Sequence, residues 1–298
     1  MHGAHVQWAI QKERLTRHRH HWGRPGDVRD LYLPRLPGLE RPIDVMVECA
    51  AFGHDTNLLP QHDVALDHTL TLRHDARRAR IPHHLAHVYS AFHTSPSREA
   101  VVMVIDAQGS PATAAAPSDV QPAASFFHVD RERIRGIGMQ TAHRDAHGPA
   151  GLGMFYFLLT QALFPGEGND GKVMGLAPYG DPQALGMPPL EVEGLQVGIP
   201  AVWQALLAEH ARWRFGAPHA SFTNSANLAA AGQRAFEEAL LGLARWLHRH
   251  TGLDDLCFAG CAALNCAAND RLLRAGPFRR VFVPPSPGPA GTALGCAI

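Results

Sequence analysis

A run of apolar residues, from Val101 to Ile105, ends in a single carboxylate, Asp106, and this run constrains the fold more than any other segment. A strand that is apolar at every position is typical of a sheet that helices cover on both faces. In open α/β sheets, ligands bind outside the carboxyl ends of such strands. We therefore predict an α/β fold in which Asp106 lies at a ligand site.

Two histidines that lie four residues apart precede this strand. Leu85, Val88 and other apolar residues alternate with the histidines at helical spacing, which predicts a helix that begins at Pro82. His83 and His87 then lie on one face of the helix, within reach of a common ion. Two imidazoles and the Asp106 carboxylate form a ligand set that suits Fe, Zn or Mn. The spacing thus predicts a metal site.

Two other interpretations of these histidines need comparison. The chain contains 20 histidines, so a chance pair at helical spacing is the plain structural alternative. The zinc-peptidase motif H-E-x-x-H requires a Glu where this chain has His84, which argues against a peptidase of that type. No C-x-x-C pair is present, so we do not expect a zinc site made of thiolates.

Composition narrows the class of protein. A chain of 298 residues can form one large domain or two lobes. The 27 basic and 27 acidic residues balance, which argues against a nucleic-acid or anionic-membrane surface. The five cysteines are odd in number and lie mostly in apolar segments, as expected for reduced core thiols of a cytosolic protein. With no signal peptide and no bilayer-length apolar run, we predict a cytoplasmic protein.

The remaining segments alternate between strands and helices. Strands are predicted at 42–51, 125–129, 256–259 and 281–283, and helices at 151–164, 226–250, 263–275 and from 291 onward. Gly136 is expected to begin a glycine-rich connection. The glycine-dense segment 165–182 contains Lys172 but lacks the Lys-Ser/Thr pair of a Walker A loop, so we predict a turn-rich loop.

Five blocks in a fixed order carry a family resemblance: 13–17, 83–87, 171–180, 263–266 and 291–295. Together they resemble the nodulation-factor and antibiotic O-carbamoyltransferases. The resemblance implies an actin/hexokinase-like two-lobed α/β fold, akin to the tRNA threonylcarbamoyl-transfer proteins and truncated at the N-terminal strand. The first lobe would span residues 1–165 and the second residues 166–298, and the C-terminal activating domain of the family would be absent.

The resemblance also implies a function and its site residues. The reaction would transfer a carbamoyl group from carbamoyl adenylate, an ATP-derived nucleotide, to a small-molecule hydroxyl, around Fe(II) or another divalent metal. His83, His87 and Asp106 fall on three of the family's metal ligands. The nucleotide-side positions, where carbamoyl adenylate would bind, are Arg19, Asp106, Gly260 and Asn265.

The chain departs from the family pattern at several places. Pro289 stands where the family has an Asp as fourth metal ligand, and Cys261 replaces the second glycine of the nucleotide turn. The family's His-Asp segment, which would act on the acceptor hydroxyl, would precede Met1, so no catalytic residue is assigned. We expect a carbamoyltransferase that needs a separate activating domain or subunit. The alternative is a non-catalytic truncated or degenerate copy that acts as a binding module.

Overall fold

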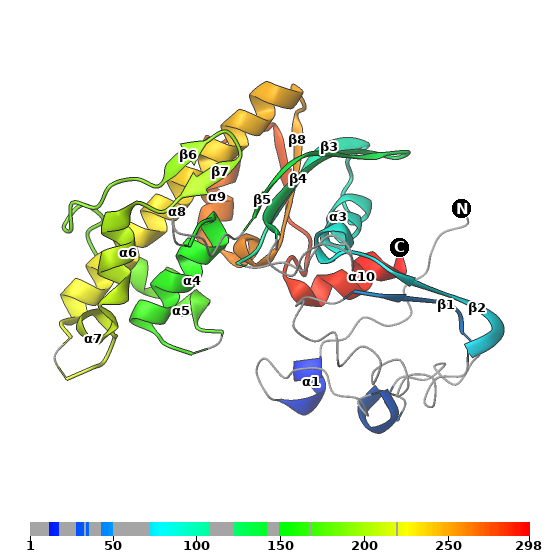
Figure 1. Cartoon of the computed structure of the whole chain (residues 1–298), viewed down its shortest axis with the longest axis horizontal. Coiled ribbons are helices and arrows are strands. Elements are labelled where there is room, and N and C mark those ends of the chain that lie inside the picture. Colours follow the sequence, from blue (N-terminus) through cyan, green and yellow to red (C-terminus); the bar gives the residue numbers. More distant parts are fainter. Residues whose placement is uncertain are drawn as a thin grey trace.

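A computed structural model describes residues 12–17, 28–32, 34–35, 43–49, 72–107, 122–141, 149–166, 168–218 and 220–298. Groups of strands and groups of helices follow one another along the chain (Figure 1). The strands are β1 Ile43–Glu48, β2 Leu72–Arg80, β3 Glu99–Ile105, β4 Pro122–Asp130, β5 Ile134–Thr141, β6 Glu191–Glu193, β7 Gln196–Gly198, β8 Asp255–Ala259 and β9 Arg280–Phe282. The helices are α1 Lys12–Thr16, α3 His83–Thr94, α4 Leu152–Leu163, α5 Asp170–Leu176, α6 Ala201–Ala208, α7 His210–Trp213, α8 Phe222–Thr251, α9 Cys266–Ala275 and α10 Thr292–Ala297. The predicted mixed α/β class is confirmed.

A five-stranded sheet forms the centre, in the order β5-β4-β3-β8-β9. β3 pairs parallel with β8 and antiparallel with β4, so it lies in the middle of the sheet. Successive side chains of a strand point to opposite faces, and β3 buries both sets. Its odd-numbered residues Val101, Met103 and Ile105 join one apolar cluster, whereas Ala100, Val102 and Val104 join another with α3. The prediction of a strand buried on both faces is therefore confirmed.

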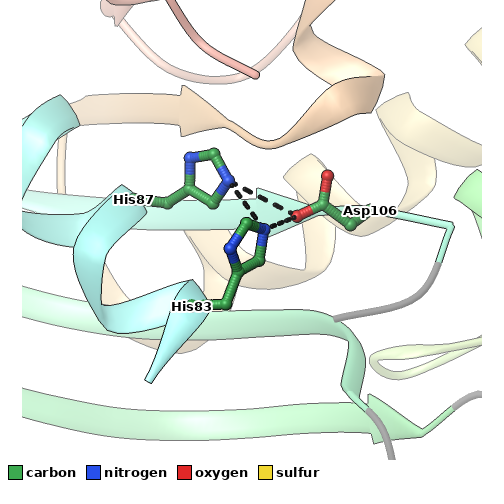
Figure 2. A group of neighbouring side chains, drawn as sticks. All are labelled: His83, His87 and Asp106. Atoms are coloured by element: carbon green, nitrogen blue, oxygen red, sulfur yellow. Dashed lines mark hydrogen bonds and ion pairs between the residues drawn. The ribbon is translucent and has the colours of Figure 1, made fainter. Parts of the chain in front are cut away.

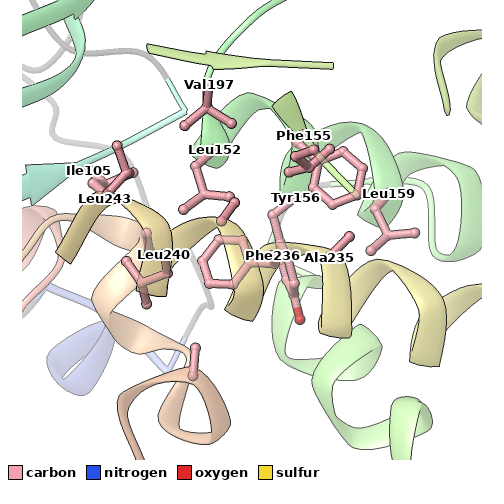
Figure 3. Close-up of a cluster of buried hydrophobic side chains, with 14 of the residues drawn as sticks. Ile105, Leu152, Phe155, Tyr156, Leu159, Val197, Ala235, Phe236, Leu240 and Leu243 are labelled. Carbon is pink, nitrogen blue, oxygen red and sulfur yellow. The ribbon is translucent and has the colours of Figure 1, made fainter. Parts of the chain in front are cut away.

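The larger apolar cluster lies between the sheet and helices α4 and α8. Figure 3 shows side chains of α4 facing those of α8 across this core. Phe155 packs edge-to-face on Trp203 at 5.0 Å between ring centres, and Tyr156 packs on Phe236 at 4.9 Å. Full burial of a large apolar side chain contributes roughly 1.5–3 kcal/mol. This core holds the sheet on the side opposite to α3.

The long amphipathic helix was predicted at 226–250 and is observed as α8. It starts four residues earlier than predicted and ends where expected, because Gly252 adopts the left-handed conformation that closes a helix. The Gly252 N–H donates to the His248 carbonyl at 2.8 Å.

Three local predictions were wrong. The glycine-dense segment forms a helix, α5, and a short turn, because burial of Val173 and Leu176 offsets the cost of its glycines. Gly136 lies inside β5 rather than in a connection. The helix expected from residue 263 begins at Cys266, since Asn265 caps it with a side-chain bond from the Ala268 N–H.

The cysteines are free thiols. Cys257 is buried as expected, whereas Cys261 and Cys266 are exposed, so the prediction of core residues was wrong for these two. In the part of the chain that the structure describes, no helix is long and apolar enough to cross a membrane.

Candidate metal centre

Helix α3 supplies two of the predicted ligands. It begins directly after Pro82, whose backbone is extended, so His83 opens the helix and His87 follows one turn later. Helix α10 packs closely against α3. A side chain at Gly295 would overlap the carbonyl oxygen of Ala86, so the glycine permits this contact. This contact with α10 helps to hold α3, and with it the two imidazoles, in place against the sheet.

The alternation of β3 places Asp106 on the same side of the sheet as α3. Its backbone N–H donates to the Ala123 carbonyl of β4 at 2.9 Å, and its Oδ1 accepts the Cys261 N–H. The preceding Gly260 has φ 92° and ψ 173°, and a side chain there would overlap the Ile105 carbonyl. Gly260 thus allows the turn after β8 to reach Asp106. One carboxylate oxygen is held by backbone, and the other faces α3.

Three side-chain atoms converge at this point (Figure 2). Asp106 Oδ2 lies 3.2 Å from His83 Nε2 and 3.5 Å from His87 Nε2. The two imidazole nitrogens are themselves 3.2 Å apart. All three residues are at most 2% exposed. Among the described residues, they form the one group of three or more His, Cys, Asp or Glu side chains close enough for a shared ion.

These distances fit a metal ion. Ligand atoms with bonds of about 2.1 Å to one tetrahedral ion lie about 3.3–3.5 Å apart. Hydrogen bonding leaves an atom at the centre of the cluster unsatisfied, since Asp106 Oδ2 has no hydrogen-bond partner among the described residues. Buried polar atoms without partners are rare and call for an explanation such as an ion. The site therefore passes this geometric test for a divalent cation.

The protonation states also suit ligands, which must be deprotonated to bind a metal. Burial lowers the pKa of His87 to about 3, and the nearby Asp106 charge opposes this only in part. Burial pushes the pKa of Asp106 upward, but contacts with His83 and His84 outweigh it and hold this pKa well below its ordinary value. At neutral pH, the site thus presents a neutral His87 beside an ionised carboxylate.

Two residues near the cluster were missed by the sequence prediction. His84 Nε2 lies 3.6 Å from Asp106 Oδ2, and His84 Nδ1 lies 2.7 Å from Ser125 Oγ. The adjacency of His84 to His83 was a usable signal. Ser125 gave none, because its position depends on how β4 pairs with β3.

The other predicted site residues have different surroundings. Gly260 lies beside Asp106, as expected for one site. The Asn265 side chain is occupied, because it caps α9 and exchanges two hydrogen bonds with Gln233. Pro289 opens the turn before α10, and its carbonyl accepts the Thr292 hydroxyl at 2.6 Å. Arg19 lies outside the described residues.

A family model and several known proteins are similar to this chain in sequence. A family model described as Carbamoyltransferase N-terminus matches residues 55–194 and 201–298. An uncharacterized protein of Synechocystis is 33% identical over 233 residues, which cover 72% of this chain and 35% of that protein. The nodulation protein NolNO of Sinorhizobium fredii is 31% identical over 236 residues, covering 75% and 31%. A tRNA N6-adenosine threonylcarbamoyltransferase of Gloeobacter violaceus is 30% identical over 220 residues, covering 72% and 57%.

A solved structure supports the fold. HypF of T. kodakarensis superposes with a TM-score of 0.52 at 13% sequence identity, over 85% of this chain and 39% of that one. At this identity, the likeness shows the fold alone. The chain spans about a third of the length of the first two relatives.

Proposed function

The chain belongs to the family of the carbamoyltransferase N-terminal domain, and from this premise we propose that it transfers a carbamoyl group from carbamoyl adenylate to a hydroxyl group of a small molecule. The observation that carries the proposal is the convergence of His83, His87 and Asp106 in one buried cluster. These are the three side chains expected to hold the metal. Their convergence could not be read from spacing alone, because Asp106 is on a different element.

The fold proposal is an actin/hexokinase-like arrangement of two lobes, residues 1–165 and 166–298. The likeness to HypF supports an α/β fold of this kind. The central sheet combines β3, β4 and β5 of the first segment with β8 and β9 of the second, so the two segments share one sheet. Asp106 comes from the first of these segments and Gly260 from the second, and the two lie side by side. A site at the junction of the segments suits a reaction that joins two substrates.

The chain's own residues would bind the ion and set its surroundings. His83 and His87 would offer neutral nitrogens, and Asp106 Oδ2 a negative oxygen. The Cys261 N–H holds the other carboxylate oxygen, which prevents Asp106 from rotating away. Burial of the cluster keeps bulk water from the ligand atoms. A divalent ion, Fe(II) by family resemblance, would polarise the carbamoyl oxygen and stabilise negative charge on it.

The nucleotide would bind on the side of the Gly260 turn. Glycine-containing turns present backbone N–H groups to phosphate oxygens. Because the Asn265 amide is occupied by Gln233 and by α9, its proposed contribution is to fix the start of α9 beside this turn. Arg19 would add a positive charge for the adenylate.

Activation of the carbamoyl group is assigned to a separate domain or subunit. The chain matches about a third of the length of its first relatives. By the family resemblance, its five blocks would belong to the transfer part. Carbamoyl adenylate would then be delivered to this chain rather than made by it.

Metal binding and transfer can be tested together. Dialysis against Zn(II) should load one ion per wild-type chain, and carbamoyl adenylate supplied to the loaded protein should carbamoylate a hydroxyl acceptor. His87→Ala should lose both, because it removes one of three ligands. His93→Ala, on the exposed side of the same helix, is the matched control and should keep both. Stoichiometric zinc in His87→Ala would contradict the site.

A second candidate function is a binding module without catalysis. Pro289 favours it, since this residue offers no side-chain ligand and its carbonyl is bonded to the Thr292 hydroxyl. In that case the protein would bind zinc and carbamoyl adenylate, but no acceptor in a broad panel of alcohols and sugars would become carbamoylated.

A further inference from the structure

A third histidine, His84, approaches the same carboxylate oxygen as the two predicted ligands. It is 4% exposed, and its Nε2 lies 3.6 Å from Asp106 Oδ2. Its other nitrogen, Nδ1, lies 2.7 Å from Ser125 Oγ. Among the described residues, His84 Nε2 has no hydrogen-bond partner. His84 is thus held at one end and points its free nitrogen at Asp106.

Electrostatics selects one tautomer of His84. If Nδ1 carried the proton, the Nε2 lone pair would face the ionised Asp106 oxygen, which places two acceptors against each other in a buried site. If the Ser125 hydroxyl instead donates to Nδ1, the proton resides on Nε2 and faces the carboxylate. The second arrangement satisfies Ser125 and stabilises the negative charge on Asp106. The carboxylate therefore selects the nitrogen that carries the proton, and the hydroxyl fits this tautomer because it can donate to Nδ1.

The strand register explains why these residues meet. Ser125 of β4 lies opposite Val104 of β3, two residues before Asp106. Side chains that are two residues apart share a face of the sheet. Val104 belongs to the cluster on the α3 side, so Ser125 and Asp106 both face α3. His84 bridges them from the first turn of that helix.

His84 does not belong to the ligand group itself. The ligand atoms that all lie within 4.8 Å of one another come from His83, His87 and Asp106. The ring centre of His84 is 5.9 Å from that of His83, whereas His83 and His87 are 4.6 Å apart. The ring of His84 therefore lies farther from His83 than the ring of His87 does.

We propose that Ser125 and His84 are positioning residues that hold Asp106 Oδ2 in place for a divalent cation. This inference rests on the proposed metal site at His83, His87 and Asp106. Groups that orient metal ligands commonly change metal affinity about 10–100-fold when removed. The expected effect is therefore on affinity, with the ligand set unchanged.

The test is a zinc-affinity measurement on the full chain by competition with a chelator. His84→Leu should weaken zinc binding about 10–100-fold. His84→Gln, which keeps an amide N–H toward Asp106, should retain more affinity than His84→Leu. Ser125→Ala should weaken binding as well, because His84 then loses the bond that holds its ring toward Asp106. Ser225→Ala removes a buried hydroxyl that bonds to the Trp213 carbonyl, and should bind zinc as the wild type does.

A double-mutant cycle on zinc affinity shows whether Ser125 acts through His84 or whether each substitution weakens binding independently. Because Ser125 acts through His84, the double variant should bind zinc no more weakly than His84→Leu alone. If the losses of zinc affinity in the two single variants add up in the double variant, Ser125 does not act through His84 and the inference is overturned. With cobalt in place of zinc, the visible absorption bands of Ser125→Ala and His84→Gln should match the wild type, and loss of a nitrogen ligand in the His84 variant would overturn the positioning role.

The zinc measurements distinguish a wrong positioning role for His84 and Ser125 from a wrong metal site. Unchanged zinc affinity in both His84→Leu and Ser125→Ala, together with loss of zinc in His87→Ala, overturns the inference and leaves the site intact. A wild-type chain that binds no zinc overturns both. Thermal melting of the metal-free variants checks that each is folded.

Discussion

Substitution of Gly260 by Ala tests how the turn after β8 reaches Asp106. Gly260 has φ 92° and ψ 173°, a conformation that is essentially restricted to glycine. An added side chain would also overlap the Ile105 carbonyl oxygen at the end of β3. The substitution therefore strains the backbone and forces β3 and the turn apart.

The size of the effect follows from these two causes. A residue held in a disfavoured backbone conformation costs about 1–3 kcal/mol, and overpacking in a tight site adds about 1–3 kcal/mol. We expect a loss of about 2–6 kcal/mol in the free energy of unfolding. Gly252→Ala is the matched control, because Gly252 has φ 67° and an added side chain would meet nothing within 4 Å. Its expected cost is about 1–2 kcal/mol.

Urea denaturation of both variants, followed by circular dichroism, measures the difference. Zinc affinity should also fall in Gly260→Ala, since displacement of the turn withdraws the Cys261 N–H from Asp106. Gly252→Ala should bind zinc as the wild type does. A Gly260→Ala protein that is as stable as Gly252→Ala and binds zinc normally would refute the close approach of turn and carboxylate.

Two further predictions concern acid stability and the activation step. The buried Asp255 carboxylate accepts bonds from Ser97 and Arg280, which outweigh its burial and lower its pKa below the ordinary value. The ionised Asp255 therefore stabilises the folded chain above about pH 4, and this stabilisation is lost as the pH falls below that value. Thermal melts from pH 6 to pH 3 should show Asp255→Asn less stable at pH 6, with the gap closing toward pH 3; a constant gap would contradict this. Separately, the isolated chain should release no phosphate from ATP or carbamoyl phosphate above a protein-free control, and robust release would contradict delivery of carbamoyl adenylate from elsewhere.

Much of the fold could be predicted from periodicity. The run from Val101 to Ile105 indicated a central strand, and the glycine at position 252 marked the end of α8. The segment 165–182 was misassigned because glycines dominate its composition. Its helix depends on burial of Val173 and Leu176 against other elements, which local sequence does not encode.

The site was predictable where spacing or family blocks carried the signal. His83 and His87 share a helix face, and Asp106 follows a recognisable strand. The contributions of His84 and Ser125 were not predictable, because they depend on the β3–β4 register and on the direction of each ring. The capping of α9 by Asn265 was also not predicted from the sequence, and its position on the nucleotide side stays a prediction.

The cost of the histidine cluster bears on the choice between an active site and a decayed copy. His84 Nε2, His87 Nδ1 and Asp106 Oδ2 are buried without hydrogen-bond partners among the described residues. Each such atom costs about 1–3 kcal/mol relative to a satisfied one. Apolar side chains of similar size would make this part of the core more stable, so the cluster does not serve stability. A bound cation would satisfy Asp106 Oδ2 and give the converging nitrogens a common partner. A chain free of functional constraint has no reason to keep this costly arrangement, which favours a working metal site even with Pro289 in place of a fourth ligand.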